Sequence, residues 1–153
     1  KAGITVPIMV LNPENSSFNA MIAYDLEPEI YSITGLNAFL KIAQITANKM
    51  INELGCNANN IKVIFGPSIH SCCYEVSDEL LNIVKTSFGE NFCIGKNIDL
   101  KGINIKLLED VGIRHINVSN ICTKCSNEPF IPFRKNPKTG RFAGIISLAN
   151  DLY

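Results

Sequence analysis

Two pairs of cysteines are the residues with the most evident chemical potential in this sequence. Cys72 and Cys73 are adjacent, and Cys122 and Cys125 form a Cys-x-x-Cys pair further along the chain. Four thiolates can satisfy one tetrahedral zinc ion, but zinc ribbons use two matched Cys-x-x-Cys pairs and adjacent cysteines rarely share an ion. A redox role is also disfavoured, because Ser126 begins a turn-like segment rather than the helix that would lower a thiol pKa. We therefore expect separate, reduced thiols.

The two histidines and two of the arginines are weaker candidates for chemistry. Neither His70 nor His115 has another metal ligand or a carboxylate at helical spacing. His115 lies in an apolar strand pattern and is expected to be structural, whereas His70, in a loop after a strand, is the better candidate to touch a ligand. Arg134 and Arg141 suit phosphate or carboxylate recognition through paired donors, and solvated surface arginines are an equally good interpretation.

Length, charge and composition limit the class of protein. The 153 residues fit one domain, and the 14 basic and 14 acidic residues balance, so we expect neither a nucleic-acid nor an acidic-membrane partner. The longest apolar stretches, such as 6–11, are far shorter than the roughly 20 residues of a membrane helix. Six cysteines in a chain that needs no disulfide for stability indicate reduced thiols and a cytoplasmic location.

Hydrophobic periodicity predicts alternating strands and helices. Apolar residues recur at helical spacing over 35–54, and Ser77 and Asp99 are suitable N-caps for two further helices, over 78–88 and from 100 to near Gly112. The predicted strands cover residues 3–11, 18–24, 29–33, 61–65, 113–118 and 142–148. This order predicts a layered, mixed-sheet α/β domain.

Several uncommon motifs occur together in a characteristic order. They are GPSIHSCCYEV from Gly66 to Val76, then IDLKGINIKLLEDVGI, ICTKCSNEPFIPFRKNPKTGR and AGIISL. Over roughly residues 30 to 149 this order resembles the C-terminal half of the YfiH-type family, also called the laccase-domain or multicopper polyphenol oxidase-like family. The resemblance implies one YfiH-like α/β domain over 1–153, with the N-terminal part of the fold missing and an insertion near 15–29.

The resemblance also implies where a metal should bind. The family builds its metal site from an N-terminal His, a Cys in an Ala-Asp-Cys-x-Pro strand and a His that opens His-Ala-Gly-Trp-Arg-Gly. Here the Cys position aligns with Thr5 and the second His position with Ser32, while the first His would precede Lys1. We therefore expect no catalytic residue, metal or cofactor in this chain, and zinc or copper only if another segment completes the site.

Members of this family are associated with purine nucleoside phosphorolysis and deamination. With the metal ligands replaced, the resemblance implies a non-catalytic, pseudoenzyme-type binding domain. Its expected ligand is a small molecule such as a nucleoside, bound by Cys73, Tyr74, Arg134 and Arg141. The 15–29 insertion, whose apolar side chains could form an exposed patch, is a second expected contact, for a protein partner. The alternative is a metal-dependent purine nucleoside phosphorylase, adenosine deaminase or polyphenol oxidase whose ligands come from a missing segment or another chain.

Overall fold

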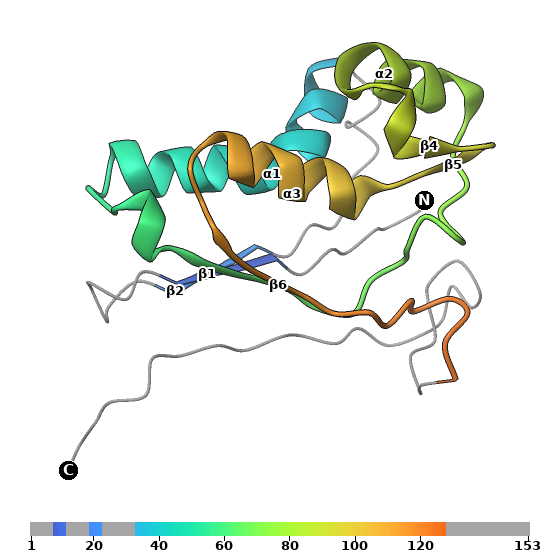
Figure 1. Ribbon diagram of the computed structural model, residues 1–153. Coiled ribbons are helices and arrows are strands. Elements are labelled where there is room, and N and C mark those ends of the chain that lie inside the picture. The colour runs from blue at the N-terminus through green and yellow to red at the C-terminus, as the bar shows by residue number, and fades with distance from the viewer. Residues whose placement is uncertain (1–7, 12–18, 23–32, 128–153) are drawn as a thin grey trace.

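A mixed four-stranded sheet is the centre of the fold (Figure 1). The computed structural model describes residues 8–11, 19–22 and 33–127. The strand order is β2-β1-β3-β6; β1 runs antiparallel to both of its neighbours, and β3 runs parallel to β6. The strands are β1 (Ile8–Leu11), β2 (Asn19–Ile22), β3 (Lys62–Phe65) and β6 (His115–Val118). The expected mixed-sheet α/β class is confirmed; the strand expected at 142–148 lies outside the described residues.

Two helices, α1 (Ile33–Asn52) and α3 (Leu100–Asp110), pack against each other and against one face of the sheet (Figure 1). Burial alternates along β3, where Val63 and Phe65 are buried and Lys62 is exposed, because successive side chains point to opposite faces of a sheet. The core between the helices and the sheet consists of Ala43, Ala47, Met50, Cys56, Ile61, Val63, Phe65, Leu108 and Ile113. None of the helices in the described ranges is long and apolar enough to cross a membrane.

A second core cluster lies beneath α2 (Asp78–Phe88) and a short hairpin, β4 (Cys93–Ile94) and β5 (Asn97–Ile98). The hairpin and two 3-10 turns, η2 (Ala58–Asn60) and η3 (Glu90–Phe92), were not expected from the sequence. The buried members of this cluster are Leu40, Tyr74, Leu81, Val84, Phe92, Ile98, Leu100 and Ile103. Because α3 contributes to both clusters, it links the sheet to the hairpin layer.

The predicted helices are confirmed, and two of them begin at the expected caps. The Ser77 hydroxyl accepts a hydrogen bond from the Leu80 amide at 3.3 Å, and the Asp99 carboxylate accepts one from the Gly102 amide at 2.9 Å. Each bond satisfies an amide that the first helical turn leaves without a partner. The first helix covers Ile33–Asn52 rather than 35–54. Residue 33, predicted as the last residue of a strand, is therefore the first residue of this helix.

Replacing Ser77 with Ala should lower the free energy of unfolding by about 1 kcal/mol, because the Leu80 amide loses its capping acceptor. Chemical denaturation followed by circular dichroism measures this loss. Ser87→Ala, at an exposed position in the last turn of the same helix, is the matched control and should stay within about 0.5 kcal/mol of the parent chain. Equal losses in the two variants would contradict the capping role.

Candidate metal centre

Two loops leave the sheet side by side. Because β3 and β6 are parallel and pair in register up to Phe65 and Val118, the chain leaves both strands at the same edge of the sheet. The first loop, 66–77, carries the GPSIHSCCYEV motif, and the second begins at 119 and carries the Cys-x-x-Cys pair. Sites in open α/β sheets commonly lie outside the carboxyl ends of parallel strands.

The backbones of the two loops are paired. A parallel bridge joins Ser68 to Cys122, with the Ser68 amide donating to the Ile121 carbonyl at 3.3 Å and the Thr123 amide donating to the Ser68 carbonyl at 3.0 Å. Ser68, Cys122 and Thr123 are all buried. This pairing extends the strand contact by a few residues and fixes the relative position of the two cysteine pairs.

A tight turn in each loop then presents the cysteines. The His70 carbonyl accepts hydrogen bonds from the amides of Cys73 and Tyr74, both at 2.9 Å, so the chain folds back at Cys72. In the second loop the Cys122 carbonyl accepts from the Ser126 amide at 3.0 Å, which returns Cys125 towards Cys122. Both turns are therefore held by backbone groups.

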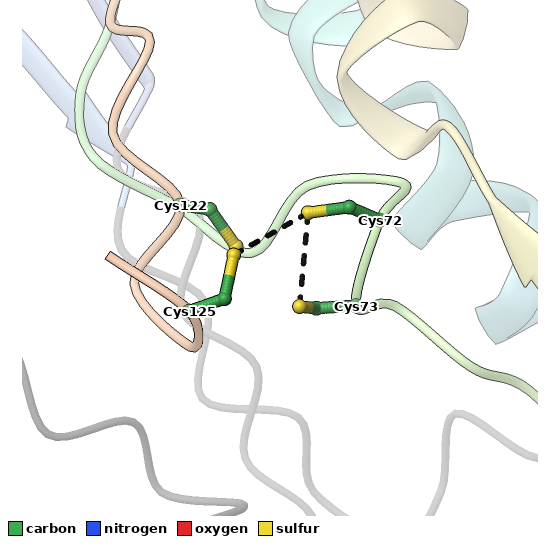
Figure 2. Close-up of side chains that lie close together, drawn as sticks. All are labelled: Cys72, Cys73, Cys122 and Cys125. Carbon is green, nitrogen blue, oxygen red and sulfur yellow. Dashed lines mark hydrogen bonds between the residues drawn. The ribbon is translucent and has the colours of Figure 1, made fainter. Parts of the chain in front are cut away.

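The four thiols converge on one point, as Figure 2 shows. The sulfur atoms of Cys72, Cys73, Cys122 and Cys125 all lie within 4.8 Å of one another, and we call this group the four-cysteine cluster. Cys72 Sγ is 3.6 Å from Cys125 Sγ and 3.7 Å from Cys73 Sγ. All four are free of disulfide bonds, as expected. Contrary to the expectation of separate thiols, the two pairs lie together, and the turn at His70 directs the sulfurs of both adjacent cysteines to the same side.

The pKa values of Cys122 and Cys72 are shifted in opposite directions. Burial raises the pKa of the Cys122 thiol, but hydrogen bonds from the backbone amides of His70, Lys124 and Cys125 outweigh it and lower this pKa to about 6. Burial of the sulfur and hydrogen bonding with Cys125 raise the pKa of Cys72 to about 12, and negative charge on Cys122 adds to this rise. Without a bound cation, Cys122 therefore ionises more readily than Cys72.

A lysine and a histidine flank the cluster. Lys101 Nζ lies 2.9 Å from His70 Nε2 and donates to the Ser119 carbonyl at 3.1 Å, so α3 is tied to both loops. Burial and the adjacent ammonium group of Lys101 lower the pKa of His70. The neutral ring accepts a hydrogen bond from this ammonium group through Nε2. His115 is exposed at the first residue of β6, at the opposite end of that strand from the cluster. Neither histidine belongs to the group of possible metal ligands among the described residues.

The structure describes only two of the four ligand-binding residues expected from the sequence, Cys73 and Tyr74. Cys73 is half-buried within the four-cysteine cluster. Tyr74 is only 1% exposed and packs in the second core cluster, although its predicted contact with a ligand stays a prediction. Four further positions lie outside the described residues: Thr5, Ser32, Arg134 and Arg141. No role for Lys101 was predicted from the sequence, because no motif relates its position on α3 to the two loops.

The stability of the metal-free, reduced chain should increase between pH 7 and 8. In the folded chain the pKa of Cys122 is about 6 against an ordinary 9.0, so in this window only the unfolded state holds the proton. The free energy of unfolding then rises with pH, by at most about 1.4 kcal/mol per pH unit. Above this window the unfolded-state ionisation of Cys72, Cys73 and Cys93 opposes the rise, because folding raises the pKa of each of these thiols. Urea denaturation in the presence of a chelator and a reductant measures the slope. His70, whose pKa is lowered from 6.5, contributes mainly below pH 7 and with the same sign. Cys122→Ser should flatten the profile, and an unchanged slope would contradict this origin.

Comparison with known proteins identifies the family. The family model described as multi-copper polyphenol oxidoreductase laccase matches residues 35–149. The chain belongs to this family. The matched range includes both loops of the four-cysteine cluster, and the resemblance to YfiH-type proteins expected from the motifs is confirmed.

Several named relatives of this laccase-domain chain act on purine nucleosides. A purine nucleoside phosphorylase of Clostridium acetobutylicum is 32% identical over 111 residues, which are 69% of this chain and 47% of that protein. An adenosine deaminase of an unknown prokaryotic organism is 30% identical over 117 residues, 69% of this chain and 44% of that protein. The chain thus spans about half the length of these relatives.

A solved structure supports the same family and fold. The YfiH protein of Bacillus licheniformis aligns with a TM-score of 0.69 and 25% identity, over 88% of this chain and 51% of that one. The match again covers about half of the longer protein. The YfiH-like fold expected from the sequence motifs is therefore confirmed for this laccase-domain chain.

The donor atoms of the four-cysteine cluster, which contains none of the positions aligned with the family's His–Cys–His set, can be compared with those of copper sites. Copper centres that transfer electrons combine imidazole with thiolate, as in His₂Cys sites. The group of three or more possible ligands found in the described residues contains four thiols and no imidazole. This donor set does not fit an electron-transfer copper site, whereas four sulfurs in a tetrahedral arrangement are typical of zinc or iron–sulfur ligation.

Proposed function

We propose that this chain is a purine-nucleoside-binding domain of the laccase-domain family that does not itself perform a metal-dependent reaction, and that it works in a reducing, cytoplasmic compartment. The relatives named as a purine nucleoside phosphorylase and an adenosine deaminase supply the ligand class. The observation that carries the non-catalytic part is the replacement of two of the family's metal ligands, at the positions of Thr5 and Ser32.

A catalytic zinc site keeps one coordination position open for water or substrate, usually beside three protein ligands. The positions aligned with the family's Cys and second His carry hydroxyl groups instead, on Thr5 and Ser32. A hydroxyl at its ordinary pKa is a poor replacement for a thiolate or imidazole ligand. These two replacements support binding without turnover.

The nucleoside contacts in this proposal are Arg134 and Arg141, because Tyr74 is only 1% exposed and Cys73 belongs to the four-cysteine cluster. The arginines provide planar, paired donors that would suit a phosphate held beside the nucleoside. Cys73 lies in the loop that follows β3, at the sheet edge described above. Replacing either Arg134 or Arg141 with Ala should weaken binding of a nucleoside together with inorganic phosphate. Arg114→Ala is the matched control, since Arg114 is exposed and precedes the opposite end of β6.

The proposal is tested by measuring binding and turnover in the same samples. The full chain is incubated with adenosine, inosine or guanosine, with and without inorganic phosphate and Zn²⁺, and free base and deaminated product are separated by chromatography. The Clostridium acetobutylicum relative serves as the active control. Calorimetry or ligand-observed NMR measures binding. We expect binding without product above the protein-free control.

The possible outcomes separate the two parts of the proposal. Product formation that a chelator abolishes would overturn the non-catalytic part and favour the phosphorylase or deaminase alternative. Absence of both binding and product would overturn the nucleoside as the ligand. Binding that Arg114→Ala weakens as much as Arg134→Ala would remove the arginine contacts from the proposal.

A further inference from the structure

We propose that Cys72, Cys73, Cys122 and Cys125 together bind one structural Zn²⁺ ion that clamps the two loops at the carboxyl ends of β3 and β6. The four sulfurs lie within 4.8 Å of one another although the two pairs are far apart in sequence, with Cys72 and Cys125 separated by 53 positions. This site is distinct from the His–Cys–His set of the family, and the inference does not depend on nucleoside binding.

The sulfur–sulfur distances match the size of a single zinc ion. A Zn–S bond of about 2.3 Å places the sulfurs of a regular tetrahedron about 3.8 Å apart. Cys72 Sγ is already 3.6 Å from Cys125 Sγ and 3.7 Å from Cys73 Sγ, and the longest separation in the cluster is below 4.8 Å. Small rotations of the thiols therefore complete the tetrahedron, and the enclosed space suits one ion rather than a cluster of several irons.

The backbone supports the ligands as outer-shell groups do in known metal sites. The amides of His70, Lys124 and Cys125 hydrogen-bond to the Cys122 sulfur, so amides from both loops point to the same ligand. Such outer-shell hydrogen bonds orient metal ligands and tune their charge. The turn that closes Cys122 to Ser126 gives the Cys-x-x-Cys pair the curvature needed for both thiols to reach one ion.

The surrounding charges favour a centre with excess negative charge. Four thiolates around one Zn²⁺ leave the site doubly negative, and two lysines lie beside it. Lys101 is close enough to interact electrostatically with Cys72 and Cys122, and its ammonium group is held by the Ser119 carbonyl at 3.1 Å. Lys124 Nζ donates to the Cys73 carbonyl at 3.4 Å. The geometry thus supplies both the ligands and the counter-charge.

A disulfide explains the same geometry less well. A disulfide requires a sulfur–sulfur bond of about 2.0 Å and uses two thiols only, so it leaves the convergence of the other two without a cause. Cys72 has neighbours at nearly equal distances, 3.6 Å to Cys125 and 3.7 Å to Cys73, and so no preferred disulfide partner. A shared cation accounts for all four positions at once.

The test is metal stoichiometry and spectroscopy on the full chain. The protein is purified under reducing conditions without chelator, and zinc, iron and copper per chain are measured by mass spectrometry. We expect one zinc per chain. Replacing Zn²⁺ with Co²⁺ should give the intense visible and charge-transfer bands of a tetrahedral tetrathiolate site, and their intensity reports the number of thiolate ligands.

Single substitutions identify the ligands. Cys72→Ser and Cys125→Ser change exposed residues and should weaken zinc binding by more than the roughly 10- to 100-fold loss that follows removal of an outer-shell partner. Cys93→Ser is the matched control, because Cys93 lies in β4, outside the four-cysteine cluster, and should retain one zinc. Lys101→Met tests the counter-charge and should cost 10- to 100-fold in affinity.

Several results would overturn the proposal. They are failure of the reduced chain to bind Zn²⁺, an octahedral Co²⁺ spectrum, iron or copper as the resident metal, or a Cys72–Cys125 disulfide trapped by alkylation directly from cells. Equal zinc loss in Cys93→Ser would do the same. If a ligand variant fails to fold, as judged by circular dichroism, the Co²⁺ spectrum of the unchanged chain still decides the number of thiolates.

Discussion

Adding Zn²⁺ to the reduced, metal-free chain is expected to raise its free energy of unfolding by about 4 kcal/mol once free zinc reaches a thousand times its Kd. The proposed ion binds the folded chain because only folding brings the loops after β3 and β6 together. When the unfolded chain has no such site, the free energy of zinc binding adds to the free energy of unfolding. Urea denaturation in zinc-buffered solutions measures the effect, and the midpoint should rise steadily with free zinc concentration.

The control variants make this expectation specific. Cys125→Ser should show little zinc-dependent shift, because it removes one of the four ligands. Cys93→Ser keeps the four-cysteine cluster and should show the full shift. A midpoint independent of zinc in the unchanged chain would mean that the cluster gains no folding energy from the ion. A shift that persists in Cys125→Ser would place the stabilising zinc elsewhere.

The elements that the sequence predicts well are those with local signals. Ser77 and Asp99 are short polar residues directly before helical apolar patterns, and both accept the capping bonds expected of them. The β4–β5 hairpin was missed because each strand has only two residues, too few to show alternation. Its turn does contain a signal, since Gly95 has a φ of +60°, a conformation that favours glycine.

The candidate site was predicted only in part, for a physical reason. The sequence shows that Cys72 and Cys73 follow one strand and that Cys122 follows another. It does not show that these strands are parallel neighbours, so the two pairs could not be brought together from spacing alone. The turn that presents both adjacent thiols depends on one carbonyl, that of His70, and no residue preference reveals such a bond. The relevant signal was therefore the shared position of both pairs after predicted strands.

The four-cysteine cluster also changes the interpretation of the conspicuous GPSIHSCCYEV motif. Tyr74 faces the core between α2 and the hairpin, while Cys72 and Cys73 face the second loop. The motif thus anchors one loop to two separate structures. Lys101 adds a third connection, because it bridges α3 to His70 and Ser119. A segment with so many structural contacts can be distinctive in sequence without holding a reacting group.

The second large effect is expected from Phe65→Ala, which should lower the free energy of unfolding by about 3–5 kcal/mol. Phe65 is 1% exposed and packs with buried residues of α1, α3 and the sheet, so truncation leaves a cavity. Ile64→Ala, on the partly exposed opposite face of β3, is the matched control and should cost clearly less. Chemical denaturation of both variants, saturated with zinc and free of it, measures the losses.

Phe65 also tests how the sheet positions the proposed zinc site. Its contribution to the loops is a backbone bond: the Phe65 carbonyl accepts from the Ser119 amide at 2.9 Å, and truncation of the side chain leaves this bond in place. Phe65→Ala should therefore lose stability while its folded form binds zinc nearly as tightly as the unchanged chain. Lys101→Met should show the reverse, with weakened zinc binding and a smaller stability loss in the metal-free state. Weaker zinc binding by folded Phe65→Ala would instead show that core packing, rather than strand pairing, holds the four sulfurs together.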